Sequence, residues 1–271
     1  MRTGISTGCL YPMLTEQSID TLVALGFDVF EIFFNSFSEL ETDYLDKLRF
    51  CLERHHARVV SLHPFTSSFE SFLLFSNYER RFLDGVAFYE MYFRAAQHLG
   101  ASMVILHGLN TEYRSTISDQ EYFRRFACLQ ERAQHYNVTL LQENVAKFRS
   151  KSSEFLQRMA EEIPESAAFV CDIKQALRCE TDPVEIVRSM GSRLRHLHIS
   201  DDSADHRCIL PGQGCYDYRR LFDCLHELGY NGDLIIEVYR FSFRELSELV
   251  QSRRFLEEQL SPYFSGRRSQ P

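Results

Sequence analysis

The stretch AFVCDIKQALRCETDPVEIVRSMGSRLRHLHI, residues 168–199, decides the fold. It opens and closes with short apolar runs, Ala168–Asp172 and Leu194–Ile199, which have the length and composition of buried β-strands. Between them, Asp182-Pro183-Val184-Glu185 combines an acidic N-cap, an early proline and a later glutamate, which together start a helix. Met190-Gly191 then supplies the glycine that ends one. We therefore predict one strand–helix–strand unit with parallel strands.

The same alternation of a short apolar run and a longer helical stretch recurs along the chain. Three more helical stretches end on glycine, at Leu25-Gly26, Leu99-Gly100 and Leu228-Gly229, and another apolar run follows each within a few residues. Because parallel strands are joined by such crossover helices, the pattern predicts a parallel sheet. The eight runs predicted as strands are Gly4–Cys9, Asp28–Phe34, Ala57–His63, Ser102–His107, Val138–Glu143, Ala168–Asp172, Leu194–Ile199 and Asp233–Val238.

Eight strand–helix units favour a closed barrel over an open, doubly wound sheet. An open sheet usually has fewer strands and a glycine-rich phosphate loop after the first of them. Here the first strand leads into Gly8-Cys9-Leu10-Tyr11-Pro12, which lacks that pattern. The 271 residues fit one barrel, and no linker or change of composition indicates a second domain. We predict an α/β fold, a single-domain (β/α)8 barrel over residues 1–262, with a flexible tail over residues 263–271.

Composition and charge narrow the classes of partner. The formal net charge of −8 gives no sign of the basic surface that holds a phosphate backbone, so we expect no nucleic-acid partner. No apolar run approaches the ~20 residues of a membrane span, and no N-terminal stretch resembles a signal peptide. The eight cysteines are scattered without a CxxC pair. These observations predict a soluble cytoplasmic protein with free thiols.

Polar residues recur at the ends of the predicted strands. In a barrel of this kind the chemistry lies at the C-terminal ends of the strands, and the strands themselves are expected to be apolar almost throughout. One polar strand end is unremarkable, whereas seven of eight indicate a functional site. These residues are Glu31, His63, His107, Glu143, Asp172, His198 and Glu237.

Three of these residues, Glu143, Asp172 and Glu237, are carboxylates that would converge on one small space. They would repel one another, and burying each without a partner costs several kcal/mol. One divalent cation held together with an imidazole removes both problems, and this donor set suits Mn²⁺, Mg²⁺, Co²⁺ or Zn²⁺. The alternative is a buried salt-bridge network, for which the available cations are Lys147, Lys174 and Arg240.

Five segments carry a resemblance to a known group of barrels: Leu141–Val145, Cys171–Ala176, His196–Asp201, Leu210–Gly214 and Ile235–Tyr239. Together they resemble the xylose isomerase-like TIM barrel superfamily over residues ~4–260. That group includes sugar phosphate isomerases and epimerases, ketose 3-epimerases, inosose dehydratases, hydroxypyruvate isomerases and endonuclease IV-type DNA repair enzymes. The motifs are specific for the superfamily and do not select a substrate.

The resemblance to the ketose 3-epimerases implies a ligand set and a reaction. It implies one divalent metal ion bound by Glu143, Asp172, His198 and Glu237, with the two glutamates also moving the substrate proton. The metal would clamp the carbonyl and hydroxyl oxygens, acidify the C–H bond between them and stabilise an enediolate. One glutamate would remove the proton and the other return it on the opposite face. The implied function is a metal-dependent isomerase or epimerase of a sugar or sugar phosphate.

Two positions depart from the epimerase pattern. Gln175 stands where those enzymes have a substrate-binding histidine, and Ala204 stands where they have an arginine. Gln175 can still hydrogen-bond a hydroxyl group, and Lys174 or Arg207 can supply positive charge. Glu31 is expected to contact the substrate or support a ligand. The candidate substrate-binding residues are His63, His107, Gln175, Glu31, Lys174, His206 and Arg240.

Three alternatives remain open at this point. A metal-assisted dehydratase of a keto-sugar or cyclitol would use the same enolate and expel water. An endonuclease IV-like enzyme would need three zinc ions, but Gln175 and the unspaced pair Asp205-His206 leave the third without ligands. A barrel that binds sugar or metal without turnover belongs to a different class, and it predicts stabilisation by ligand with no product.

The segment 64–76, PFTSSFESFLLFS, contains four phenylalanines and two leucines beside the expected catalytic face. So apolar a segment is not expected to lie bare in water. Phe65, Phe69 and Phe72 would suit a lid that excludes water from the substrate. A contact in a homo-oligomer and a helix packed on the barrel are the other possibilities.

Overall fold

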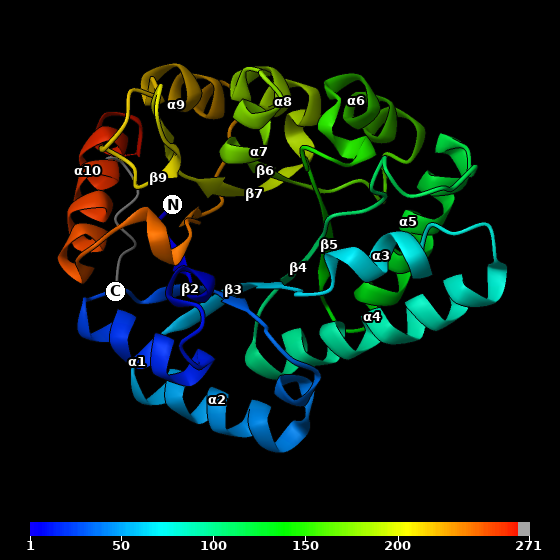
Figure 1. The fold of residues 1–271 in the computed structure, drawn as a ribbon, viewed down its shortest axis with the longest axis horizontal. Coiled ribbons are helices and arrows are strands. Elements are labelled where there is room, and N and C mark those ends of the chain that lie inside the picture. The colour runs from blue at the N-terminus through cyan, green and yellow to red at the C-terminus, as the bar shows by residue number, and fades with distance from the viewer. Residues whose placement is uncertain (265–271) are drawn as a thin grey trace.

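The computed structural model describes residues 1–264, which form a closed barrel of eight parallel strands surrounded by helices (Figure 1). Parallel pairing of β1 with β10, in which Gly4 lies opposite Ile235, closes the barrel. The predicted TIM barrel is confirmed, and each of the eight predicted runs contains a strand. The first run, predicted to extend to Cys9, is a strand only to Ser6, because Thr7–Leu10 form a 3-10 helix. The strands are β1 (Thr3–Ser6), β2 (Val29–Phe33), β3 (Arg58–His63), β4 (Met103–Leu106), β5 (Thr139–Glu143), β6 (Phe169–Asp172), β7 (Leu194–Ile199) and β10 (Leu234–Ile236).

The helices cover the outside of the barrel (Figure 1). They are α1 (Thr15–Ala24), α2 (Thr42–Arg54), α3 (Ser67–Leu73), α4 (Glu79–Leu99), α5 (Asp119–Gln134), α6 (Ser153–Glu162), α7 (Ile173–Arg178), α8 (Pro183–Met190), α9 (Tyr218–Glu227) and α10 (Leu246–Phe264). Short 3-10 helices lie at η1 (Thr7–Leu10), η2 (Phe37–Leu40), η3 (Arg149–Lys151), η4 (Gly191–Arg193) and η5 (Arg240–Ser242). Within residues 1–264, no helix combines the length and the apolar character needed to cross a membrane.

The predicted helix ends are confirmed by backbone geometry. Gly26, Gly100, Gly191 and Gly229 all have positive φ angles, between 56° and 86°, in the region that glycine adopts without a steric penalty. All eight cysteines are free, as expected. The predicted flexible tail, 263–271, lies outside the described residues from position 265 on, and its first two residues complete α10.

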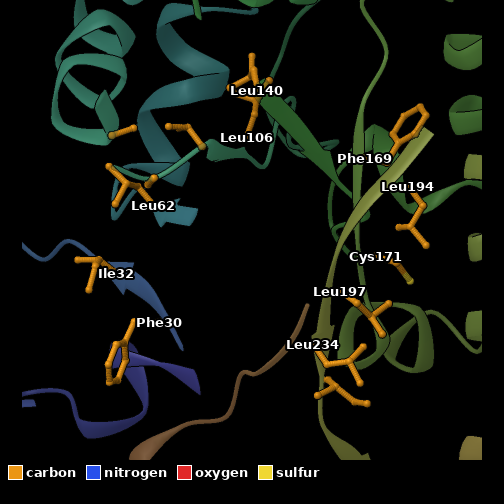
Figure 2. Packing of buried hydrophobic residues seen from close by; sticks show 14 of the residues in the cluster. Phe30, Ile32, Leu62, Leu106, Leu140, Phe169, Cys171, Leu194, Leu197 and Leu234 are labelled. Carbon is orange, nitrogen blue, oxygen red and sulfur yellow. The ribbon is translucent and has the colours of Figure 1, made fainter. Parts of the chain in front are cut away.

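Side-chain alternation along the strands separates the apolar core from the barrel interior. Side chains of one parity, such as Phe30, Ile32, Cys171 and Leu197, belong to the main core between strands and helices (Figure 2). The side chains at the alternate strand positions point into the barrel and form two small separate clusters. Because successive strand residues point to opposite faces, a polar residue two positions after a member of these clusters also points inward. The members are Ile105, Leu141, Ala168 and Val170 in one cluster, and Val29, Val60 and Ile235 in the other.

One element was not predicted from the sequence. A short antiparallel hairpin, β8 (Asp201–Asp202) and β9 (Arg207–Ile209), follows β7. Asp201 is buried, and its carboxylate accepts hydrogen bonds from four backbone N–H groups at 2.8–3.2 Å. The donors are the N–H groups of Asp202, Gly212, Gly214 and Tyr216. The hairpin has few backbone hydrogen bonds between its strands, and the Asp201 carboxylate instead fixes the position of the segment 210–216.

Replacing Asp201 by alanine is expected to lower the free energy of unfolding by about 3 kcal/mol or more, since four N–H groups lose a charged acceptor. Asp201→Asn keeps the shape and one acceptor oxygen, so its loss should be smaller. Denaturant titration of the three proteins measures the difference. A loss of less than about 1 kcal/mol for Asp201→Ala would show that the hairpin and the following segment keep their structure without these hydrogen bonds.

Candidate metal centre and active site

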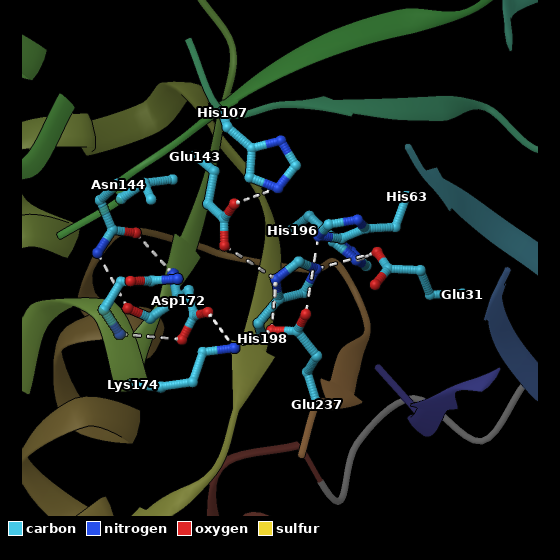
Figure 3. Close-up of polar contacts among 12 residues, drawn as sticks. Glu31, His63, His107, Glu143, Asn144, Asp172, Lys174, His196, His198 and Glu237 are labelled. Atoms are coloured by element: carbon cyan, nitrogen blue, oxygen red, sulfur yellow. Dashed lines mark hydrogen bonds and ion pairs between the residues drawn. The ribbon is translucent and has the colours of Figure 1, made fainter. Parts of the chain in front are cut away.

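Four side chains from four neighbouring strands meet at the C-terminal end of the barrel (Figure 3). Glu143 ends β5, Asp172 ends β6, His198 lies near the end of β7, and Glu237 follows β10 directly. One ligand atom of each lies within 4.8 Å of the others. Leu141, Val170 and Ile235 of the inner clusters precede the three carboxylates by two positions, so strand alternation directs these carboxylates inward.

Three buried atoms of this cluster make no hydrogen bond within residues 1–264. Buried Glu143 Oε2, Asp172 Oδ2 and His198 Nδ1 accept or donate no hydrogen bond within the described residues. His198 Nδ1 lies 3.3 Å from Glu237 Oε2 and 3.6 Å from Glu143 Oε1. Asp172 Oδ2 lies 3.0 Å from Lys174 Nζ, and Glu143 Oε2 lies 3.6 Å from His107 Nε2. Buried polar atoms are nearly always hydrogen-bonded, so atoms that are not hydrogen-bonded are available to a cation. Three carboxylates and an imidazole form a donor set that fits a divalent cation.

Burial and mutual repulsion act on the charges of the cluster. Burial, opposed by the Lys174 ammonium and reinforced by the carboxylates of Glu237 and Glu143, raises the pKa of Asp172 to about 8. Burial acts in the same direction on Glu143, but the nearby imidazoles of His198 and His107 lower its pKa below the usual value. Lys174 and His198 likewise outweigh burial and hold the pKa of Glu237 well below its usual range. The two glutamates are therefore the carboxylates that stay ionised without an added cation.

A buried network behind His198 fixes which ring nitrogen faces the cluster. His198 Nε2 lies 2.9 Å from Glu31 Oε2, and that oxygen also accepts a 2.7 Å hydrogen bond from Ser61. His196, two residues earlier on β7, approaches the same oxygen at 3.3 Å. Because Nε2 donates to the carboxylate, Nδ1 is the nitrogen that faces the cluster and that a bound cation would use. Glu31 thus supports a candidate ligand, which was one of the two roles expected for it.

Glu31→Gln is expected to weaken binding of a divalent metal by about 10- to 100-fold, the usual effect of removing a carboxylate behind a ligating histidine. Glutamine keeps the shape but loses the charge that orients the ring. Titration of metal-stripped protein with Mn²⁺ or Zn²⁺ measures the change. Glu39→Gln is the matched control, since Glu39 is also a buried carboxylate but contacts Thr15 and Asn35. Equal affinity in wild type and Glu31→Gln would rule out this support.

Two further histidines face the glutamates. His63 Nε2 lies 3.7 Å from Glu237 Oε1, while its Nδ1 lies 3.2 Å from the Pro64 carbonyl oxygen. His107 Nε2 lies 3.6 Å from Glu143 Oε2, and the two histidine rings are 4.8 Å apart, edge to face. His63, His107 and Glu143 form a second group whose ligand atoms lie within 4.8 Å of one another. Each histidine therefore presents Nε2 to the same space.

The orientation of His107 depends on Glu70, which the sequence analysis did not single out. Glu70 lies in α3, is buried, and accepts hydrogen bonds from Tyr89 Oη and Gly108 N, both at 2.6 Å. His107 Nδ1 lies 3.0 Å from its Oε1. Burial acts to lower the pKa of His107, but Glu70 outweighs it and raises that pKa to about 9. His107 is thus held as a cation beside Glu143.

A cavity of about 420 Å³ adjoins the cluster, and four of its ten lining residues are aromatic. Glu237 and Lys174 supply its charged groups, and the ring of Phe33 stacks on His63 with centroids 4.7 Å apart. This arrangement offers an apolar wall beside polar, charged groups, which is typical of a small-molecule site. The lining residues are Ser6, Gly8, Tyr11, Phe33, Asn35, Phe65, Lys174, Glu237, Val238 and Tyr239.

The chain as a whole was compared with known proteins. A family model described as the xylose isomerase-like TIM barrel matches residues 19–259. The chain belongs to this family. The resemblance inferred from the sequence motifs is thereby confirmed.

Curated relatives match the xylose isomerase-like barrel along nearly its full length. An uncharacterised protein of Mycobacterium leprae is 24% identical over 287 residues, covering 94% of this chain and 96% of its own. Another, from Methanocaldococcus jannaschii, is 23% identical over 273 residues, covering 96% and 89%.

Solved structures agree on the fold of this xylose isomerase-like barrel. A D-tagatose 3-epimerase-like protein has a TM-score of 0.81 at 22% identity and covers 98% of this chain and 99% of its own. An L-ribulose 3-epimerase has a TM-score of 0.78 at 19% identity, covering 100% and 99%. The IOLI protein with a bound zinc atom has a TM-score of 0.74 at 18% identity, covering 98% and 100%. At these identities the likeness shows the fold.

Four substrate-binding candidates of this xylose isomerase-like chain lie at different distances from the cluster. Lys174 contacts two carboxylates of the cluster, Asp172 and Glu237. Gln175 lies beside it, half-buried, with Oε1 accepting a hydrogen bond from Ala146 N at 3.2 Å. His206 is exposed in the turn between β8 and β9, and Arg240 is exposed in η5, where it donates to the Phe243 carbonyl at 3.0 Å. Neither lines the cavity beside the cluster, and their roles stay predictions.

The phenylalanine-rich segment divides between cavity, core and solvent. Phe65 lines the cavity, Phe75 is buried in the core, and Phe69 and Phe72 remain 52% and 42% exposed on α3. Within residues 1–264, Phe69 and Phe72 of α3 are therefore not fully covered, and the lid and oligomer roles stay predictions. Buried Glu70 ties this helix to His107, so the segment also supports the site.

Proposed function

We propose that this protein is a divalent-metal-dependent isomerase or epimerase that acts on a sugar or sugar phosphate. The observation that carries the proposal is the cluster of Glu143, Asp172, His198 and Glu237 beside a cavity, with one ligand atom of each residue within 4.8 Å of the others. A bound divalent ion would polarise the carbonyl and hydroxyl oxygens of the substrate and acidify the C–H bond between them. The fold neighbours named as 3-epimerases support this choice.

The two glutamates are proposed to move the proton. Both have pKa values below the usual range, so they are ionised and each can accept a proton from an acidified carbon. One removes the proton, and the other returns it on the opposite face of the enediolate, which inverts the carbon. His107 faces Glu143 as a cation and can stabilise its charge. His63 faces Glu237, but burial and the charge of His107 lower the pKa of His63, so it faces Glu237 as a neutral imidazole. The aromatic cavity wall limits the access of water.

The polar side chains around the cavity are proposed to orient the substrate. Lys174 and Asn35 line it and can hydrogen-bond hydroxyl or anionic oxygens. A relative that is similar over part of the chain supports a carbohydrate substrate. A putative L-ribulose-5-phosphate 3-epimerase of Escherichia coli is 29% identical over 76 residues, covering 25% of this chain and 27% of its own.

The first test uses the wild-type protein. Metal-stripped protein is loaded with Mn²⁺, Co²⁺, Zn²⁺ or Mg²⁺ and incubated in D₂O with free and phosphorylated ketoses. Deuterium at the carbon beside the carbonyl, together with a new epimer or isomer, is the expected result. A dehydratase would instead give a product that absorbs as an enone. Stabilisation by a sugar without product or exchange from any substrate would contradict an enzymatic role.

The number of metal ions per chain distinguishes the proposed function from the DNA repair alternative. His63, His107 and Glu143 form a second candidate set, and a centre with two or three zinc ions would favour the DNA repair alternative. Asp205 and His206, which a third zinc would need, are both exposed in the β8–β9 turn. We therefore expect about one metal ion per chain by elemental analysis. Two or more zinc ions per chain would contradict the single-metal proposal.

A further inference from the structure

Lys174 is a buried cation in contact with two of the four proposed ligands (Figure 3). Its Nζ donates to Glu237 Oε2 at 2.8 Å and lies 3.0 Å from Asp172 Oδ2. The other two cations considered for a salt-bridge network do not reach these carboxylates. Lys147 is 71% exposed and pairs with Glu112, and Arg240 is exposed in η5. Lys174 alone of the three neutralises the cluster.

The ammonium group and a metal ion would use the same oxygen atoms. Glu237 Oε2, which accepts from Lys174, is also the oxygen that lies 3.3 Å from His198 Nδ1. Asp172 Oδ2, the other oxygen beside the ammonium, is one of the buried atoms of the cluster that accept no hydrogen bond. A divalent ion between these atoms would therefore lie within a few ångströms of the ammonium. Like charges at that separation repel strongly in a buried site, where little water screens them.

The structure offers the ammonium an adjacent position. Lys174 lines the cavity next to the cluster, and so does Tyr239. Nζ already lies 5.3 Å from the centroid of the Tyr239 ring, within the range of a cation–π contact. The lysine side chain is a flexible four-carbon stem, so its Nζ can leave the carboxylates without a change of backbone.

We propose that Lys174 competes with the divalent metal for Asp172 and Glu237. Without metal, its ammonium holds the two carboxylates together. When a metal binds, the ammonium turns into the cavity, against Tyr239, where it faces the substrate. The inference rests on the metal site of the proposed function but not on the reaction or the substrate. It predicts that Lys174 weakens metal binding while stabilising the metal-free protein.

The test is titration of metal-stripped protein with Mn²⁺ and with Zn²⁺, without any substrate. Lys174→Met removes the charge and keeps most of the stem, and it is expected to bind metal about tenfold more tightly than wild type. Lys174→Gln keeps a hydrogen-bond donor, and its metal affinity should lie between those of wild type and Lys174→Met. Arg178→Met is the matched control. Arg178 lies on the same short helix α7 and contacts Tyr239 Oη at 3.2 Å, but it makes no ion pair with a proposed ligand. Its metal affinity should change by less than about threefold.

Thermal unfolding supplies a second readout that does not depend on activity. Lys174→Met should melt below wild type in chelator, because the ionised Glu237 loses its buried counter-ion, and should recover that loss when metal is added. The proposed competition would be wrong if wild type bound metal as tightly as Lys174→Met and Lys174→Gln, or more tightly. The proposed metal site would not be affected by that result. Metal binding by none of the proteins would overturn the metal site as well.

Discussion

Glu237→Gln and Glu143→Gln are each expected to abolish interconversion of the two epimers, with a loss of about 10²–10⁴-fold from the missing acid–base step alone. Each glutamate serves one face of the carbon in the proposed reaction. A variant that keeps one glutamate can still remove and return the proton on that face. It should therefore exchange deuterium into one epimer without producing the other. The two variants should do so for opposite epimers.

Deuterium incorporation and epimer ratio are measured separately for each variant, starting from each epimer, with metal content checked in the same samples. The metal content matters because both glutamates are also proposed ligands. Glu53→Gln is the control for loss of a carboxylate, since Glu53 is 70% exposed on α2. Loss of exchange from both epimers in a variant that still holds metal would argue for a single base. Full activity in both variants would rule out the two-carboxylate mechanism.

The strands and the four proposed ligands could be predicted from the sequence because both follow local rules. Parallel strands in a barrel read as short apolar runs, and the glycine after each helix marks the next run. Glu143 and Asp172 are the last residues of their strands, and Glu237 follows the last residue of β10. The position of a polar residue at the end of an apolar run therefore predicts which side chains meet at this end of the barrel.

His196 and Glu70 could not be found in the same way. His196 lies on the inner face of β7, two residues before His198, but deeper in the barrel than the strand end. Period-two alternation predicts its direction, although its partner Glu31 comes from a strand 165 positions away in sequence. Glu70 lies in α3 within an apolar segment, and its contact with His107 depends on how that segment crosses the barrel. Only the three-dimensional path brings these pairs together.

The hairpin β8–β9 illustrates a different limit. Its strands contain two and three residues, too few to show a periodic pattern. What holds them is the buried carboxylate of Asp201, which binds backbone N–H groups of the following segment. The role of Lys174 is equally hidden, because the sequence shows a lysine two positions after Asp172 but not the turn of α7 that directs it to Glu237.

Asp172→Asn is expected to weaken metal binding by about 10²–10³-fold. A structural zinc site with four ligands provides roughly 10–16 kcal/mol, so the loss of one ligand removes roughly a quarter of that. The substitution removes a charge with little change of shape. The amide oxygen of the new side chain can still accept from Gln175 N, as Asp172 Oδ1 does at 3.2 Å, so the start of α7 is kept. The variant therefore separates loss of a ligand from loss of the fold.

The same variant should lose the stabilisation that metal gives. A ligand at a thousandfold excess over its Kd stabilises a protein by about 4 kcal/mol, which corresponds to a rise in Tm of roughly 8–16 °C for a chain of this size. We expect wild type to show such a rise with Mn²⁺ or Zn²⁺ and Asp172→Asn to show little or none. In chelator the variant should lose little stability, because burial and the carboxylates of Glu237 and Glu143 outweigh the Lys174 ammonium and disfavour a charge at Asp172.

His198→Ala extends the argument to the imidazole. It removes the nitrogen that lies between Glu143 and Glu237 and also leaves Glu31 without its 2.9 Å partner, so it should lose metal and stability together. The contrast between the two variants is the decisive comparison. Metal affinity should fall in both, while the stability of the metal-free protein should fall substantially only in His198→Ala. Retention of the metal-induced rise in Tm by both variants would show that metal binds elsewhere, and the cluster would then be a salt-bridge network centred on Lys174.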